Sequence, residues 1–209
     1  LTLWHPFIGK RVLESDGSEG GWDDDSQPTG DPPADLYEQA YAGYLPFIDD
    51  ESDKSNALFP ECALPREQVA TPQLRRLFQE TFSPGRTQPH RRPAMVFWAL
   101  ELARAFDLSL TCLACNMSYF ADQHIQCPYC EMPSPAFAWV NTPRWKMCIP
   151  PGTTEFSLPH RLFYPFSLEQ SNNEEYEATV DWAKKTVVPV RGTKQFPPEL
   201  AVRFVEAAT

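Results

Sequence analysis

Residues 111–130 read TCLACNMSYFADQHIQCPYC and contain four of the chain's six cysteines. These form two Cys-x-x-Cys pairs with 11 residues between the pairs, namely Cys112, Cys115, Cys127 and Cys130. Two such pairs supply the four soft sulfur ligands of a tetrahedral zinc ion, so the spacing predicts one structural zinc. Because four thiolates leave no open coordination position, we expect the metal to be non-catalytic.

The other potential ligands have simpler interpretations. Cys62 and Cys148 stand alone in the sequence, and we interpret both as small buried apolar residues. His124 lies between the two pairs and can in principle compete as a ligand, but we interpret it as a solvated loop residue. The alternative to zinc is two reduced cysteine pairs with a redox or packing role. Paired cysteines favour metal binding in a reducing compartment, so we expect a cytoplasmic protein.

Negative charge is concentrated in the first quarter of the chain. The formal net charge of the 209 residues is −10, and residues 1–60 carry 13 acidic and 3 basic side chains. This balance opposes nucleic-acid binding. A zinc-ribbon nucleic-acid-binding module is the alternative function, although no Lys or Arg lies between the two cysteine pairs.

Loops are expected to be numerous, because 22 residues are proline. Residues 14–35 are rich in Gly, Asp, Ser and Pro, and we expect them to form a mobile acidic loop. A second acidic loop begins at Asp49, where oxygen ligands alternate as at the start of a calcium loop. Lys54 and Pro60 stand where such a loop needs glycine and glutamate, which argues against calcium.

Helical periodicity dominates the region before the cysteines. Thr71-Pro72 is a favourable helix start, and a second helical repeat begins near Pro93. We also expect the end of a helix within residues 1–13 and a short helix at 35–45. The apolar positions of the two longer helices are Leu74, Leu77, Phe78, Phe82, Met95, Trp98, Leu102, Ala105 and Phe106.

The region after the cysteines changes to the two-residue period of strands. Apolar and polar side chains alternate over residues 176–182, as in a half-buried strand. Pro, Gly and Asn bound further short apolar runs, which cover residues 136–140, 145–149, 186–190 and 200–205. The sequence therefore predicts an α+β fold with a helical region at 1–110, zinc-binding knuckles at 111–131 and a β-rich module at 136–209.

The β-rich module contains more aromatic residues than a core of its size requires. Aromatics near arginines are the residue types that anchor protein interfaces, so we expect a partner surface here. The alternative is that they fill the core of a small β-sandwich. The candidates are Trp139, Arg144, Trp145, Arg161, Phe163, Tyr164 and Phe166.

Residues 1–106 resemble the end of a bacterial eukaryotic-like Ser/Thr kinase domain. The opening LTLWHPF is similar to the end of the large C-lobe helix and the His-Pro-Phe turn that follows it. Residues 74–82 resemble the penultimate kinase helix, and Arg92-Pro93 resembles the Arg-Pro that opens the last helix. The resemblance implies that Arg92 forms a structural ion pair with the glutamate that ends the activation segment.

A narrower resemblance extends to about residue 131. The segments HPFIGKRVLE and LPFIDDESDKSN, followed by the paired cysteines, are similar to one bacterial branch of these kinases. Those kinases are encoded near a von Willebrand factor A protein and a metal-dependent phosphatase, in tellurium-resistance-type phosphorylation triads. The resemblance implies a role in phosphorylation signalling, with the von Willebrand factor A protein as the candidate partner.

The catalytic motifs of a kinase are not recognisable in this sequence. It has no Gly-rich phosphate loop, no catalytic-loop Asp and Asn, and no Asp-Phe-Gly. We therefore expect a non-catalytic C-terminal piece of a larger protein, acting as a scaffold, with the kinase half upstream of Leu1. An independent enzyme is a further possibility, but no nucleophile–base pair supports it.

Overall fold

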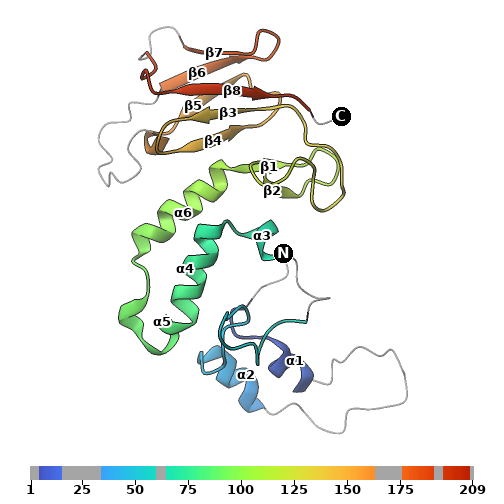
Figure 1. The fold of residues 1–209 in the computed structure, drawn as a ribbon, viewed down its shortest axis with the longest axis vertical. Coiled ribbons are helices and arrows are strands. Elements are labelled where there is room, and N and C mark those ends of the chain that lie inside the picture. Colours follow the sequence, from blue (N-terminus) through green and yellow to red (C-terminus); the bar gives the residue numbers. More distant parts are fainter. Residues whose placement is uncertain (1–4, 16–33, 60–64, 163–175, 191–194, 208–209) are drawn as a thin grey trace. The chain divides into compact units, whose positions relative to one another are not determined.

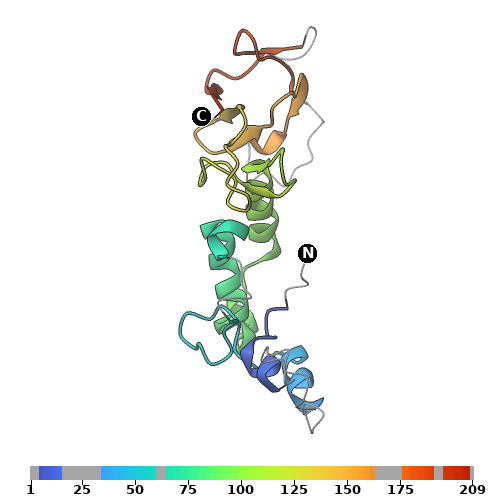
Figure 2. The ribbon, with the colours of Figure 1, turned by 90° about the vertical axis from the view of Figure 1, so that its right-hand side faces the viewer.

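The computed structural model describes residues 5–15, 34–59, 65–162, 176–190 and 195–207 (Figure 1). The chain divides into two compact units, one of residues 1–67 and 72–95 and one of residues 68–71 and 96–209. Figures 1 and 2 show helices in the first unit, and one long helix with antiparallel sheets in the second. The α+β class predicted from the sequence is therefore confirmed.

Short helices build the first unit. Val12 of α1 and Ala40 of α2 are fully buried against Leu45, and this cluster joins the two helices. The helices that begin before residue 95 have these bounds: α1 Lys10–Ser15, α2 Ala34–Tyr41, α3 Arg66–Val69, α4 Pro72–Phe82, α5 Pro84–Thr87 and the 3-10 helix η2 Pro89–Arg91.

Asn56 anchors the long loop after α2. Its Nδ2 donates hydrogen bonds to the carbonyl oxygens of Phe7, at 2.9 Å, and Pro46, at 2.8 Å. Gly9 lies so close that a Cβ there would come within 1.8 Å of the Asn56 carbonyl oxygen. Glycine is therefore required at this position, because any side chain would push the loop away.

The sequence located two of the helices in this unit well. α4 begins at Pro72, directly after Thr71, and Leu74 and Leu77 on it are buried as expected. α2 begins one residue before the short helix expected at 35–45 and ends at Tyr41, four residues earlier than expected. The loop expected to be mobile lies, except for its two ends, outside the described residues.

Helix α6 (Met95–Asp107) packs with the strands of the second unit. Its Leu100 and Ala103 contact the core of the sheets, whereas the sequence suggested a boundary after residue 110. Phe106, expected on the buried face, is 76% exposed. α6 has 13 residues, and within the described part of the chain no helix is long and apolar enough to cross a membrane.

Three antiparallel sheets form the rest of the second unit. A two-stranded hairpin carries part of the cysteine segment, and two three-stranded sheets follow in the orders β4-β3-β8 and β5-β6-β7. The bounds are β1 Ser109–Thr111, β2 Ser118–Phe120, β3 Phe137–Asn141, β4 Lys146–Ile149, β5 Glu155–Leu158, the 3-10 helix η3 His160–Leu162, β6 Tyr176–Asp181, β7 Thr186–Pro189 and β8 Ala201–Val205.

Strand β3 separates two hydrophobic clusters. Ala138 and Val140 belong to the core shared by the two larger sheets. Phe137 and Trp139, which point to the opposite face, belong to a cluster that contains Cys112 and Cys127. A strand buried on both faces reads as a continuous apolar run, which explains the sequence Phe-Ala-Trp-Val. The cysteine segment is thus packed directly on the central strand of a sheet.

Candidate metal centre

The four paired cysteines converge on one point. Their sulfur atoms all lie within 4.8 Å of one another. Cys112 Sγ and Cys130 Sγ are 3.6 Å apart, and Cys115 Sγ and Cys127 Sγ are also 3.6 Å apart. Four sulfurs placed about 2.3 Å from a central ion would be separated by about 3.8 Å along each tetrahedral edge. The spacing therefore fits a tetrahedral metal–thiolate centre.

The two knuckles have the same backbone structure. In each, the residue after the second cysteine donates its N–H to the carbonyl of the first cysteine, at 3.0 Å for Asn116 and 2.9 Å for Glu131. Both residues have a positive φ, 59° and 60°. This left-handed conformation reverses the chain, and it favours Gly and Asn over other residues.

The ends of each knuckle are held by further backbone pairing. The amide of Cys112 donates to the Met117 carbonyl at 2.9 Å, and that of Cys127 donates to the Met132 carbonyl at 2.8 Å. The first knuckle also closes the β1–β2 hairpin, in which Thr111 pairs with Ser118. Each pair of cysteines therefore sits at the tip of a closed backbone loop.

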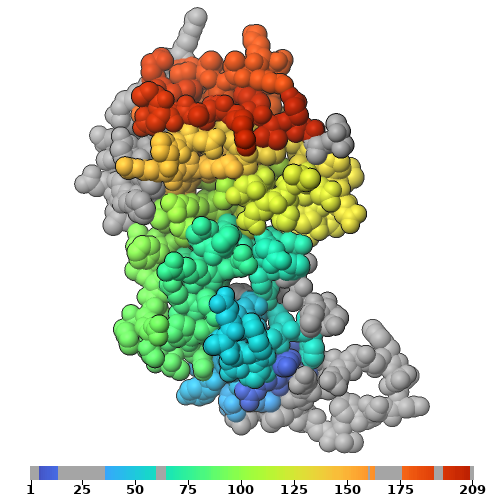
Figure 3. All heavy atoms as spheres, in the orientation of Figure 1, coloured from blue at the N-terminus to red at the C-terminus, as the bar shows by residue number. Residues whose placement is uncertain are grey.

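Packing ties the centre to the β-rich part of the same unit. Cys112 and Cys127 are buried with Tyr119 and Trp139 in one cluster. The hydroxyl of Tyr119 is 2.8 Å from Ser134 Oγ in a buried hydrogen bond. The space-filling view shows the atoms of this segment, in yellow-green, against those of strands β3 and β4 (Figure 3). Disturbing the centre must therefore disturb the sheet beneath it.

Backbone amides favour the thiolate at one position of the centre. The amides of Cys115 and Ala114 point at Cys112 and lower its pKa to about 6. At Cys130 the Met132 amide also favours the thiolate, but partial desolvation and the three neighbouring cysteine sulfurs together outweigh it and raise the pKa to about 12. A cation at the centre removes this conflict, because it attracts all four thiolates together.

The other two cysteines lie outside this arrangement. Cys148 on β4 is buried, as predicted, and burial raises the pKa of its thiol to about 12. Cys62 lies outside the described residues.

His124 does not belong to the group of four ligands. It is half-buried rather than solvated, its ring lies edge-on to Tyr119, and its Nε2 has no hydrogen-bond partner among the described residues.

In the acidic loop after Ile48, the carboxylates of Asp49 and Asp50 bind partners within the first unit. Asp50 Oδ1 accepts hydrogen bonds from the amides of Ser52, at 2.8 Å, and Asp53, at 3.1 Å. Asp49 pairs with Arg66 at 2.7 Å. Among the described residues, only the four cysteines bring together at least three His, Cys, Asp or Glu side chains that could hold one ion.

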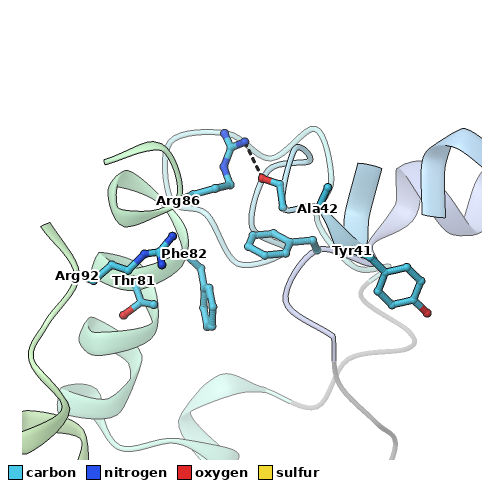
Figure 4. A pocket seen from close by; sticks show the side chains of 8 residues that line it. Tyr41, Ala42, Thr81, Phe82, Arg86 and Arg92 are labelled. Carbon is cyan, nitrogen blue, oxygen red and sulfur yellow. Dashed lines mark hydrogen bonds between the residues drawn. The ribbon is translucent and has the colours of Figure 1, made fainter. Parts of the chain in front are cut away.

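Arg92 lines a small open hollow of about 230 Å³ in the first unit (Figure 4). Its Nε donates to the Gly85 carbonyl at 2.8 Å, and its side chain is exposed. Arg86, on the same hollow, donates to the carbonyl of Tyr44 at 2.9 Å. Neither arginine forms an ion pair with a residue that the structure describes. Figure 4 shows the ring of Tyr41 pointing away from both.

The expected partner surface requires a correction at its two tryptophans. Trp139 and Trp145 are only 2% and 4% exposed, so they fill cores rather than present a surface. Trp139 is buried because β3 is covered on both faces. Trp145 is buried because it packs into the core of the two larger sheets, where its indole N–H binds Asp107. Arg144 is exposed. The remaining aromatic candidates, Phe163, Tyr164 and Phe166, lie outside the described residues.

Arg161 instead completes a buried polar cluster that the sequence interpretation missed. It binds Asp107 with two hydrogen bonds, Nε to Oδ2 at 2.8 Å and Nη2 to Oδ1 at 2.6 Å. The indole N–H of Trp145 also donates to Asp107 Oδ2, at 2.7 Å. One signal was available: an aspartate at a helix C-terminus opposes the helix dipole and so calls for a specific partner.

The comparisons with known proteins found no relative. No family model, no curated protein and no solved structure matches the chain. The geometry of the site and the sequence patterns therefore carry the functional argument.

Proposed function

We propose that the chain is a non-catalytic, zinc-stapled protein-interaction region of a bacterial Ser/Thr-kinase-like protein. The observation that carries the proposal is that the four cysteine sulfurs lie within 4.8 Å of one another, a spacing that fits a tetrahedral centre. A centre with four protein ligands has no position for substrate or water, and its role is structural.

Zinc is the proposed occupant. A tetrahedral set of four thiolates is typical of zinc or of iron–sulfur sites, and a single point of convergence suits one ion. Structural zinc contributes about 10–16 kcal/mol of apparent binding energy in small modules, and this energy is folding energy. Since Cys112 and Cys127 are buried with Trp139, we expect this energy to stabilise the sheet as well as the knuckles.

The kinase-like assignment rests on the resemblance of residues 1–106. In that interpretation, the exposed guanidinium of Arg92 receives the glutamate that ends an activation segment. The arginine has no described acidic partner, which leaves it available for such a contact. The chain itself is proposed to transfer no phosphate, because its sequence lacks the groups that position ATP and magnesium.

The proposed partner is a protein, with a von Willebrand factor A protein as the first candidate. The remaining surface candidates in the β-rich module are Arg144 and the aromatics Phe163, Tyr164 and Phe166. The same proposal places the chain and its protein partner in the cytoplasm. A nucleic-acid partner is disfavoured, because the exposed side chains of the knuckles include Asp122 and Glu131 but no Lys or Arg.

The test is co-purification of the zinc-loaded chain with the candidate partner, using a variant that combines Phe163→Ser, Tyr164→Ser and Phe166→Ser. We expect this variant to lose the complex while Phe106→Ser, a substitution at an exposed α6 residue, retains it. Deleting residues 136–209 would not be informative, because it removes Trp139 and Trp145 from the cores. Equal binding by both variants would locate the partner surface elsewhere, and micromolar magnesium-dependent ATP affinity would refute the non-catalytic role.

A further inference from the structure

We propose that the four-cysteine centre is a site of oxidative modification, at which hydrogen peroxide forms the disulfides Cys112–Cys130 and Cys115–Cys127 and releases the metal. This inference rests on the proposed metal centre and adds a reaction of its cysteine ligands with an oxidant. It follows from the unequal exposure of the cysteines and from the distances between their sulfurs.

The four cysteines differ in their access to solvent. Cys130 is exposed and Cys115 is half-buried, whereas Cys112 and Cys127 are buried. Oxidation of a cysteine requires access of the oxidant to the sulfur. Because metal binding deprotonates all four thiols, access to solvent distinguishes them. Each buried cysteine has a more accessible one in sulfur contact at 3.6 Å, and Cys130 is the entry point for peroxide.

Two sulfur pairs in direct contact link one knuckle to the other. Cys112 Sγ to Cys130 Sγ and Cys115 Sγ to Cys127 Sγ are both 3.6 Å. A disulfide bond is about 2.05 Å long, so each pair must approach by about 1.5 Å. Both bonds can form together, because they use different cysteines, and together they consume all four ligands.

The reaction balances with one peroxide for each disulfide. The Cys130 thiolate attacks one oxygen of hydrogen peroxide, the O–O bond breaks, and the departing hydroxide is protonated to water. The resulting sulfenic acid is attacked by the sulfur of Cys112, which forms the disulfide and displaces hydroxide, again protonated to water. Each pair of thiolates loses two electrons, and the metal leaves because a disulfide sulfur carries no negative charge to hold it.

Loss of the metal should change the packing of the sheet against which the knuckles lie. Cys112 and Cys127 share a buried cluster with Tyr119 and Trp139. The cross-linked knuckles must contract around the empty centre, which changes the packing against Trp139. Tryptophan fluorescence therefore gives a second readout of the reaction, independent of the metal.

The first experiment uses the full chain loaded with zinc and freed of excess metal. Hydrogen peroxide is added stepwise, and released zinc is measured with a chromogenic chelator. We expect complete release with about two equivalents of peroxide per chain, since two disulfides form. At lower peroxide, dimedone, which traps sulfenic acids, should label Cys130 before the other three. Zinc retention under excess peroxide, or first labelling of Cys115, would overturn the proposal.

Peptide mapping tests the connectivity. Chymotrypsin cleaves after Leu113 and Tyr129 and so separates the two cysteines of each knuckle. We expect peptides that link Cys112 to Cys130 and Cys115 to Cys127, and disulfides within each knuckle would contradict the inference.

Cys148→Ala is the matched control, because it removes a buried cysteine outside the centre. It should release zinc with the same stoichiometry, and loss of the release in this variant would assign the reactivity to Cys148. A chain that binds no zinc refutes the proposed function, whereas a zinc-bound chain that resists peroxide refutes only this inference.

Discussion

Replacing Asp107 with asparagine is expected to destabilise the second unit strongly. The carboxylate is 2% exposed as a side chain and accepts three hydrogen bonds, two from Arg161 and one from Trp145. Asparagine keeps the size of the side chain but removes the charge. It therefore leaves the Arg161 guanidinium without a counter-ion next to a buried tryptophan.

The expected loss of unfolding free energy is about 2–3 kcal/mol. Breaking a fully buried ion pair costs about 3–5 kcal/mol, and an unsatisfied buried donor costs about 1–3 kcal/mol. The Arg161 side chain is 35% exposed, so water recovers part of its solvation and the estimate lies below the buried range. Urea unfolding, followed by tryptophan fluorescence on the zinc-loaded chain, measures the loss.

The matched control is Asp181→Asn. Asp181 pairs with Lys184 at 3.2 Å, but their side chains are 40% and 80% exposed, and exposed pairs contribute about 0–1 kcal/mol. The double variant Asp107→Asn, Arg161→Gln should lose less than the sum of its two single variants, because the pair acts as a unit. If Asp107→Asn is no more destabilising than Asp181→Asn, the cluster does not hold the unit together.

Two further predictions concern the knuckles and the buried thiol. Glu131→Gly should raise the stability of the zinc-loaded chain by about 1 kcal/mol, because the φ of 60° at Glu131 suits glycine. Glu131→Ala keeps the unfavourable conformation and should give no gain. Equal thermal shifts for both variants would contradict this explanation. Cys148 should stay unmodified by iodoacetamide at pH 8 in the folded chain, because burial raises its pKa to about 12. The folded state gains stability from keeping this thiol neutral; the gain is present below pH 9 and is lost as the pH rises towards 12. Rapid labelling of the folded chain at pH 8 would be inconsistent with the buried position of Cys148.

The parts of the fold that depend on short-range patterns were predictable. The two Cys-x-x-Cys pairs specify their own loop geometry, so the four ligands follow from spacing alone. Thr71-Pro72 located the start of α4, because both residues act on the first helical turn. The class of the fold followed from the change of period after the cysteines.

The positions that depend on tertiary packing were not predictable. Trp139 looked like an interface residue, because a continuous apolar run does not say what covers each face of the strand. In the structure, one face of β3 meets the sheet core and the other meets the knuckles. Asp107 gained its role only through Arg161, which lies 54 positions away in the sequence. An ion pair between residues so far apart leaves no pattern in the sequence near either residue.

The metal content of the purified chain tests the central claim most directly. Elemental analysis of the chain, purified without added metal and without chelators, should give about one zinc ion per molecule, and Cys127→Ser should lose the zinc and the structure of residues 111–131. Cys148→Ala should keep the full amount. A chain without zinc, or a Cys127→Ser variant with undiminished zinc, would contradict the four-cysteine centre on which this account depends.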